Sequence, residues 1–233
     1  MREDATQSAM EIRGAPRGGR PVSLIEVLVG AGIVIGHNVF HAVPNEVPLL
    51  FVLGIASIRL RDGSWRAIGL ARPKSWSITF AIAALTAAAL LATDQFVTEP
   101  LSQLLHLHAA KSAQTSIGLK KDDFTSLLKS LALTWTFAAF GEEIVYRRYL
   151  LGRAADLGNR SAFAYWGALF CVSVLFGIGH YYQGPAGFFQ AACAGFLIGA
   201  AYLLSGRNLW VAVLAHGLFD TVAFAAVYLG LSS

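Results

Sequence analysis

Charged residues are scarce in this chain of 233 residues. Asp, Glu, Lys and Arg make up 14% of the sequence, whereas hydrophobic residues make up 55% and the mean hydropathy is +0.56. A typical soluble domain is about 25% charged. The deficit excludes an ordinary soluble domain and predicts an integral membrane protein, with the lipid bilayer as its surroundings.

Cysteine and proline are also rare. Cys171 and Cys193 lie within apolar runs, where a thiol usually behaves as a small hydrophobic group, so no disulfide framework is expected. Seven prolines against 23 glycines suit closely packed helices rather than a barrel of alternating strands. We therefore expect an all-α fold, a polytopic transmembrane helical bundle.

Apolar runs near the length of a bilayer crossing predict seven spans in a single transmembrane domain at 22–231. A polar tail at 1–21 is expected to be disordered and cytoplasmic. The polar segment 93–123 is expected to be a long loop with a short amphipathic helix, and a crossing there would make eight spans. The seven predicted spans cover residues 22–40, 47–58, 76–92, 124–151, 162–181, 186–204 and 209–231.

The net charge of +4 does not indicate a nucleic-acid partner, because most Lys and Arg residues fall in loops on one side of the predicted bundle. The positive-inside rule then places the N-terminus in the cytoplasm and the chain in the cell (cytoplasmic) membrane as a multi-pass protein. With seven spans the C-terminus lies outside. Nothing in the sequence predicts the oligomeric state.

Ionisable residues occur inside three of the predicted spans, where they are costly to bury and indicate function. Glu143 and Arg147 are spaced i,i+4 and can pair across one helical turn. Glu142 has no such partner and is free to point into the bundle, where a carboxylate can act as a general base toward water. The structural alternative is that both glutamates anchor the end of the span.

Two further clusters lie in later spans. Phe176 is one turn from His180 and can hold its imidazole in place, and His216 and Asp220 share one helix face, where the carboxylate can orient the ring. As structural alternatives, His180 is an interfacial residue and the second pair is a polar clamp between helices. His37 and His41 also share a face but lack a carboxylate nearby in sequence, which favours an interface role.

Taken together, Glu-Glu-x-x-x-Arg at 142–147, Phe-x-x-x-His at 176–180 and His-x-x-x-Asp at 216–220 resemble the CPBP family of intramembrane endopeptidases. This family includes the type II CAAX prenyl endopeptidases and the bacterial Abi proteins. The resemblance covers a catalytic core at 124–231, and the N-terminal spans show no motif.

The resemblance implies that Glu142 is the catalytic base and that His180 helps it to activate water. His216 with Asp220 would bind the scissile carbonyl and stabilise the oxyanion, and Glu143, Arg147 and Phe176 would give structural support. Two positions depart from the usual pattern. Arg148 stands where the family often has glycine, and Asp220 stands where the eukaryotic enzymes have Asn, so it must be protonated, orient His216 or ligate a metal.

The cofactor stays open at this point. The set Glu142, His180, His216 and Asp220 could compose a zinc site of the three-ligand-plus-water kind, as in a metalloprotease, whereas a metal-free mechanism uses the same residues. The absence of His-Glu-x-x-His favours the metal-free form slightly. The segments Gly-x-Ser-Gly and Gly-x-Gly-Asp of other intramembrane proteases are also absent.

The function that the sequence predicts is therefore a membrane-embedded peptidase with a peptide or membrane-protein substrate, and its site is expected to open toward the cytoplasm. Prenylated CAAX tails are the eukaryotic substrate class, but the chain looks bacterial, which favours peptide maturation, bacteriocin self-immunity or membrane-protein processing. A non-catalytic immunity or scaffold protein and a proton-coupled transporter are the alternatives. The transporter would need paired repeats or broken helices in both halves, and neither is evident.

Overall fold

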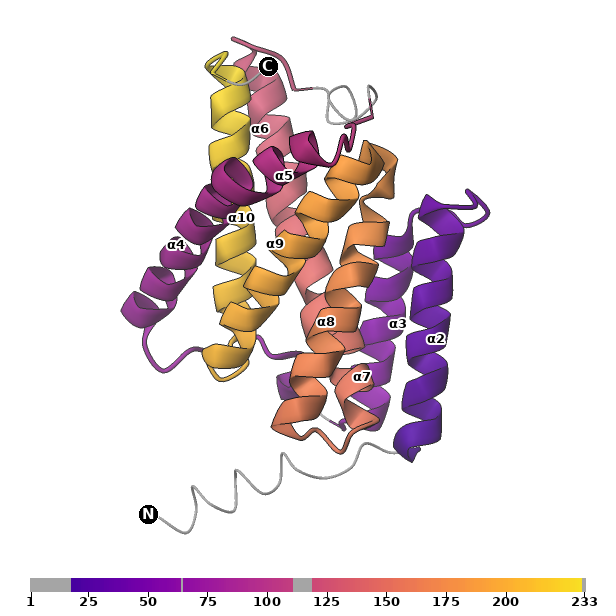
Figure 1. Cartoon of the computed structure of the whole chain (residues 1–233). Coiled ribbons are helices and arrows are strands. Elements are labelled where there is room, and N and C mark those ends of the chain that lie inside the picture. Colours follow the sequence, from indigo (N-terminus) through magenta and orange to yellow (C-terminus); the bar gives the residue numbers. More distant parts are fainter. Residues whose placement is uncertain (1–17, 64, 111–118, 232–233) are drawn as a thin grey trace.

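The computed structural model describes residues 18–63, 65–110 and 119–231, and over these residues the chain is helical without β-strands. The helices run up and down through one bundle (Figure 1). The main helices are α2 (Gly19–Asn38), α3 (Glu46–Arg61), α4 (Trp76–Thr93), α5 (Glu99–Leu104), α6 (Phe124–Leu133), α7 (Leu151–Asp156), α8 (Ala162–Gly179), α9 (Gly184–Leu204) and α10 (Leu209–Tyr228).

Two ends of the bundle are used as references below. The N-terminal end is where α2, α4, α8 and α10 begin, and the C-terminal end is where α10 finishes and α9 begins (Figure 1). Among the described residues, most Lys and Arg side chains lie at or near the N-terminal end, and the opposite end carries Lys120, Lys121 and Lys129. This distribution is the charge asymmetry that the sequence predicted.

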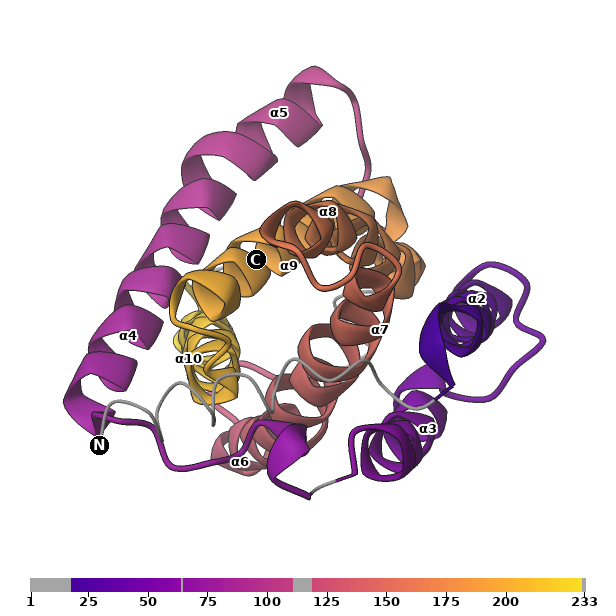
Figure 2. The same cartoon turned by 90° about the horizontal axis from the view of Figure 1, so that it is seen from below.

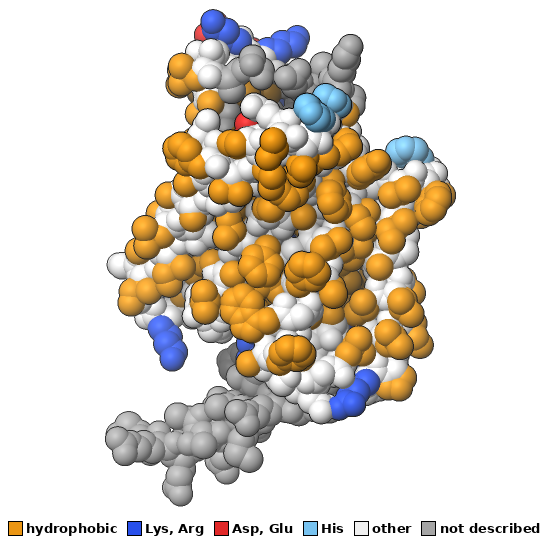
Figure 3. Space-filling model, in the orientation of Figure 1, with side chains coloured by type: hydrophobic (Ala, Val, Ile, Leu, Met, Phe, Trp, Pro, Cys, Tyr) orange, Lys and Arg blue, Asp and Glu red, His pale blue; other side chains and the backbone are white. Residues whose placement is uncertain are grey.

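Five described helices are long and apolar enough to cross a membrane, at Gly19–Asn38, Trp76–Leu104, Ala162–Gly179, Tyr181–Leu204 and Leu209–Tyr228. Large apolar side chains such as Leu28, Leu85 and Phe163 point outward, and Figure 3 shows hydrophobic side chains over the sides of the bundle. A water-soluble surface rarely carries so broad an apolar area. The predicted helical membrane bundle is confirmed, while the number of spans stays a prediction.

The two other expected spans are also helical. One is α3, which has 16 residues and extends past the predicted limit at residue 58. The other is a continuous helix from α6 to α7, whose middle is π-helical over Thr134–Glu142 and Ile144–Leu150. Neither is among the five long apolar helices.

Two predicted boundaries differ from the structure. Residues 1–17 of the predicted tail lie outside the described residues, and Gly19 already begins α2. The predicted loop at 93–123 begins too early, because the helix of α4 continues through a π-helical stretch, Asp94–Thr98, into α5. Pro100 lies in this continuous helix directly after the π-helical stretch, at a position where it has no N–H to donate.

Helices of the C-terminal half stand around the centre of the bundle, with α9 packed along α8 and α4 packed along α10 (Figure 2). Glycine permits the close approach of α8 and α9. A Cβ at Gly177 would lie 2.7 Å from the Phe188 carbonyl oxygen, and one at Gly199 would lie 2.2 Å from Leu169 Cδ1. Small residues at such positions let membrane helices pack backbone to backbone.

An ionic network ties α2, α3 and α7 together at the N-terminal end. Arg153, 2% exposed, lies 3.3 Å from Glu26, 3.2 Å from Asp62 and 3.3 Å from Asp156. Burial raises the pKa of the Asp62 carboxyl, but the charge and hydrogen bond of Arg153, with the charges of Arg148 and Arg160, outweigh it and lower the pKa below its ordinary value. The network therefore depends on ionised carboxylates.

Candidate active site

The adjacent glutamates lie where the long α6–α7 helix changes its winding. Glu142 ends one π-helical stretch, Glu143 follows it, and Ile144 begins the next. A π-helical turn takes in one residue more than an α-helical turn, so it rotates side chains away from their α-helical positions, and such turns often occur at functional sites. The α-helical geometry assumed from the sequence therefore does not hold at this point.

Glu143 is fully buried and holds two partners. Its Oε2 lies 2.9 Å from Arg147 Nε, as the i,i+4 spacing predicted, in an ion pair without the alignment of a hydrogen bond. Its Oε1 lies 2.8 Å from His216 Nδ1, a contact that the sequence did not predict. Glu143 thus joins the α6–α7 helix to α10, and both of its oxygens have partners.

Arg147 is as deeply buried as its partner. The side chain is 1% exposed, its Cζ lies 4.8 Å from the centre of the Phe176 ring, and Nη2 donates to the Gly195 carbonyl at 3.4 Å. A buried charge is tolerated only when it is paired and hydrogen-bonded. Arg147 and Phe176 accordingly form the structural support that the motifs implied.

Glu142 contrasts with its neighbour. Its Oε2 is buried and has no hydrogen-bond partner among the described residues. The carboxylate lies close enough to His216, Glu143 and Asp220 to interact electrostatically with all three. The residue as a whole is partly exposed, although this oxygen is buried. Of the two adjacent acids, Glu142 has the unpartnered oxygen.

His180 lies directly after the last residue of α8. Its Nδ1 lies 2.9 Å from the Phe176 carbonyl oxygen, and its ring centre is 4.6 Å from the Phe176 ring. A carbonyl only accepts hydrogen bonds, so Nδ1 carries the proton and Nε2 is the free nitrogen of the neutral ring. His180 also interacts electrostatically with His216 and Asp220.

His216 and Asp220 share one face of α10, as their spacing predicted. His216 Nε2 lies 3.4 Å from Asp220 Oδ2, and the ring centre is 6.2 Å from that of Phe176. Phe176 therefore touches both histidines from one side. The structure brings Glu142, His180, His216 and Asp220 together, although they come from three separate helical segments.

Arg148 faces away from this cluster. Its Nε donates to the Ala67 carbonyl, and its Nη2 lies 3.4 Å from Asp62. The residue that replaces the usual glycine therefore joins the ionic network at the N-terminal end of the bundle.

Three neighbours of the cluster were missed from the sequence. Tyr182 stacks on His180 with ring centres 6.1 Å apart and interacts electrostatically with Glu142 and Asp220. Tyr146 packs edge-on against Phe176 at 4.9 Å. Glu46 comes from α3 in the N-terminal half, which carries no motif. An acid at the first turn of an apolar helix was the one available signal for it.

Glu46 also accounts for the N-terminal histidines. His37 Nε2 lies 3.2 Å from a Glu46 oxygen, and the Asn38 amide donates to the other oxygen at 3.1 Å. His41 is exposed in the following loop with a positive φ. The pair His37 and His41 therefore does not act together, and the carboxylate partner of His37 comes from the next helix.

The neighbours of the cluster differ in exposure toward the two ends of the bundle. Toward the N-terminal end the cluster is closed by Tyr146, Arg147 and Phe176, each at most 3% exposed. At the other end it is bordered by Tyr182, which is 45% exposed. The most exposed aromatic neighbour of the cluster therefore lies on the side away from the basic, N-terminal end.

The depths of the two histidines agree once α10 is placed in the bundle. His180 lies at the end of α8, whereas His216 lies in the first half of α10. Figure 1 shows that α10 begins farther from the N-terminal end of the bundle than α8 does. Residues at different positions along their own helices therefore meet at one level.

Metal binding is poorly matched by this geometry. Within the described parts of the chain, no three His, Cys, Asp or Glu side chains are grouped as a metal would require. Both nitrogens of His216 face carboxylates, and Nδ1 of His180 is held by a carbonyl. Ligation by His216 would require the loss of one of these contacts, so the site does not fit the zinc arrangement considered above.

Comparison with known proteins supports the motif analysis. Residues 124–222 match the family model described as type II CAAX prenyl endopeptidase Rce1-like, which confirms the resemblance drawn from the three motifs. The match spans all seven residues of these motifs and ends within α10. No curated protein and no solved structure matches the chain.

Proposed function

Because residues 124–222 match the family model described as type II CAAX prenyl endopeptidase Rce1-like, we propose that the chain is a membrane peptidase that hydrolyses a peptide bond with water activated by Glu142 and His180. The observation that supports this proposal most directly is the contrast between the two adjacent glutamates. Glu143 is held by Arg147 and His216, whereas Glu142 keeps a buried oxygen without a partner. A catalytic base needs such a free oxygen.

His180 has the proton arrangement that this role requires. With Nδ1–H donating to the Phe176 carbonyl, Nε2 is left to accept a hydrogen bond from water. The backbone contact and the Phe176 ring fix the plane of the imidazole. In the proposed step, water lies between Glu142 and His180 Nε2, gives its proton to Glu142 and attacks the scissile carbonyl.

His216 is proposed to stabilise the oxyanion. Each of its ring nitrogens faces a carboxylate oxygen, so the ring satisfies both contacts best as an imidazolium that donates from both nitrogens. The Asp220 contact is the longer of the two, so Nε2–H is the donor that can shift to the oxyanion. Asp220 then orients the ring until the oxyanion forms, which accounts for an acid at this position.

Proton transfer completes the reaction without a further cofactor. Glu142 receives the proton of the attacking water and passes it to the amine of the leaving peptide as the carbon–nitrogen bond breaks. The products are a carboxylic acid, which keeps the second proton of the water, and an amine, and Glu142 returns to its starting state. A metal is not assigned a step.

The substrate is proposed to enter from the outside of the cell. The positive-inside rule assigns the basic N-terminal end to the cytoplasm, and the exposed Tyr182 borders the site on the side toward the other end. Prenylated CAAX tails in the cytoplasm would not reach it. The substrate class is therefore an extended segment of a secreted peptide or membrane protein, since a helical segment has its backbone groups engaged in its own hydrogen bonds.

The test uses the full chain reconstituted in liposomes with a mixture of internally quenched peptides. We expect cleavage by the wild-type protein and its loss in Glu142→Gln, a substitution of equal size. Asp122→Asn, an exposed acid at the same end of the bundle, is the matched control and retains activity. A scaffold protein would show no cleavage, and a Glu142→Gln variant that cleaves at the wild-type rate would refute the mechanism.

Orientation is tested separately with peptides added to intact cells and to inverted membrane vesicles. Cleavage is expected in intact cells only. Cleavage restricted to inverted vesicles would show that the site opens to the cytoplasm, as the sequence alone suggested.

A further inference from the structure

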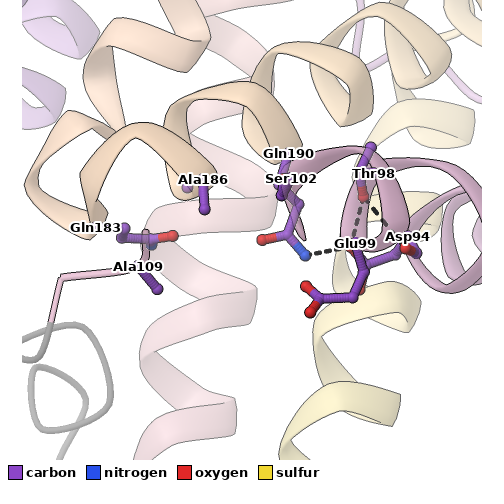
Figure 4. Close-up of a pocket in the computed structure, with 9 residues that line it drawn as sticks. Asp94, Thr98, Glu99, Ser102, Ala109, Gln183, Ala186 and Gln190 are labelled. Atoms are coloured by element: carbon purple, nitrogen blue, oxygen red, sulfur yellow. Dashed lines mark hydrogen bonds between the residues drawn. The ribbon is translucent and has the colours of Figure 1, made fainter. Parts of the chain in front are cut away.

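A second polar cavity lies beside the candidate active site, between the end of the long α4–α5 helix and the beginning of α9. It has a volume of about 180 Å³. Figure 4 shows its side chains, which come from both helices and face the same space. The polar members are Asp94, Thr98, Glu99, Ser102, Gln183 and Gln190.

The cavity contains two acids, and within the described parts of the chain neither is paired with a cation. Asp94 accepts hydrogen bonds from Thr98 Oγ1 at 2.8 Å and from Gln190 Nε2. Glu99 accepts from Gln103 Nε2 at 2.7 Å. These donors are neutral, and neither acid forms an ion pair with a described Lys or Arg.

An unpartnered hydroxyl also faces this space. Ser102 is 5% exposed and lines the cavity, yet its hydroxyl has no hydrogen-bond partner among the described residues. Buried polar groups are nearly always hydrogen-bonded, and exceptions call for an explanation such as a ligand. Acceptors on Asp94, Glu99 and Ser102 together suit a group with several N–H donors.

The size of the cavity indicates what fits. Sites for whole small-molecule ligands are about 300–1,000 Å³, so about 180 Å³ is too small for most of them. One side chain of a larger molecule fits better. The ammonium of Lys or the guanidinium of Arg brings three or five donors on a stem that can cross the apolar part of the wall.

The cavity is connected to the catalytic histidine by one short turn. Gln183, which lines the cavity, follows His180 by three residues, and its backbone N–H donates to the His180 carbonyl at 2.9 Å. Its side-chain amide donates to the Tyr182 hydroxyl at 2.9 Å, and Tyr182 stacks on His180. A 3₁₀ turn rises about 2 Å per residue, so His180 and Gln183 are about 6 Å apart along the backbone.

We propose that this cavity is a specificity subsite that receives a Lys or Arg side chain of the peptide substrate. An extended peptide advances about 3.3 Å per residue, so the basic residue lies about two to four residues from the scissile bond. The proposal rests on the proposed function and adds the substrate preference. It also agrees with the proposed entry of substrate at the C-terminal end of the bundle, where this cavity and His180 both lie.

The experiment compares quenched peptides that carry Lys or norleucine at one position at a time. Norleucine keeps an apolar stem and lacks the charge. We expect one position, two to four residues from the cut, at which Lys raises kcat/KM about tenfold, between the small effect of an exposed ion pair and the larger effect of a buried charged hydrogen bond. Asp94→Asn with Glu99→Gln should abolish the difference and leave cleavage of the norleucine peptides unchanged.

Two variants sharpen the comparison. Asp122→Asn removes an exposed acid at the same end of the bundle but outside the cavity, and it should keep the Lys preference. Glu99→Lys should turn the preference toward a peptide with Glu at the same position. Absence of a Lys preference in the active wild-type protein, or its survival in the double variant, would overturn the proposal.

Binding separates this proposal from the catalytic one. Thermal stabilisation of the wild-type protein and the double variant is measured with the Lys and norleucine peptides. If no peptide is cut but the Lys peptide stabilises only the wild-type protein, the subsite stands and the peptidase mechanism fails. If no peptide is cut and Lys gives no added stabilisation, both fail.

Discussion

Replacement of Arg147 by Met is expected to destabilise the protein strongly. Arg147 and Glu143 are buried to 2% and 0% exposure, and the substitution leaves the Glu143 carboxylate with His216 as its single close charged partner. Removal of one member of a buried ion pair typically costs about 3–5 kcal/mol, because the remaining charge is uncompensated. Arg147→Met also loses the cation–π contact with Phe176.

The double substitution Arg147→Met with Glu143→Gln should recover much of this loss. It removes both charges, while the carbonyl oxygen of the new side-chain amide can still accept from His216 Nδ1. We expect the pair to be coupled by about 2 kcal/mol or more, within the range for residues in contact. The double variant should therefore be more stable than Arg147→Met alone.

Unfolding in mixed micelles, with SDS as the titrant, measures these differences. Tryptophan fluorescence and circular dichroism are followed together, since coincident transitions justify a two-state free energy. Arg207→Met, an exposed residue bonded to the Tyr165 hydroxyl, is the control and should change stability by less than about 1 kcal/mol. A loss below about 1 kcal/mol in Arg147→Met, or simple additivity in the double variant, would refute the reasoning.

Three further predictions concern other parts of the chain. Gly217→Ala should lower the free energy of unfolding by about 1–3 kcal/mol in the same assay, because the added Cβ would lie 2.6 Å from the Trp135 ring. An unchanged unfolding midpoint would contradict this packing. Because the folded pKa of Asp62 is lowered, its ionised form stabilises the fold above the ordinary value of 3.8, and this stability should fade as pH falls through and below 3.8. Asp62→Asn should flatten that part of the stability profile, and a profile identical to wild type would count against the network. Incubation with 1,10-phenanthroline should leave the initial rate of peptide cleavage unchanged, whereas a loss that zinc restores would establish a metal enzyme.

Helix content and the main motif pairs could be predicted because they depend on short-range spacing. Apolar runs set the positions of the spans, and the i,i+4 spacing set the pairs Glu143–Arg147 and His216–Asp220. Both rules depend on the period of one helix and need no knowledge of its neighbours. The same rules missed the π-helical winding around Glu142, because they assume the period of an α-helix throughout.

Contacts between helices could not be predicted from the sequence. The partner of His216 Nδ1 is 73 residues away at Glu143, and Glu46 approaches the site from a half of the chain that shows no motif. The relation of His180 to Gln183 is local, but the acids opposite Gln183 come from the long α4–α5 helix. No pattern along the chain sets the rotation of one helix about its axis relative to another.

By itself, then, the sequence determined a helical membrane protein, its basic end and the set of residues with the chemistry for peptide hydrolysis, because hydropathy, charge and spacing within a helix are properties of the chain alone. The tertiary structure decided which glutamate keeps a free oxygen and which acids lie beside the site. Those features depend on how far each helix starts from the membrane surface and how it is rotated against its neighbours, and side-chain packing between helices fixes both.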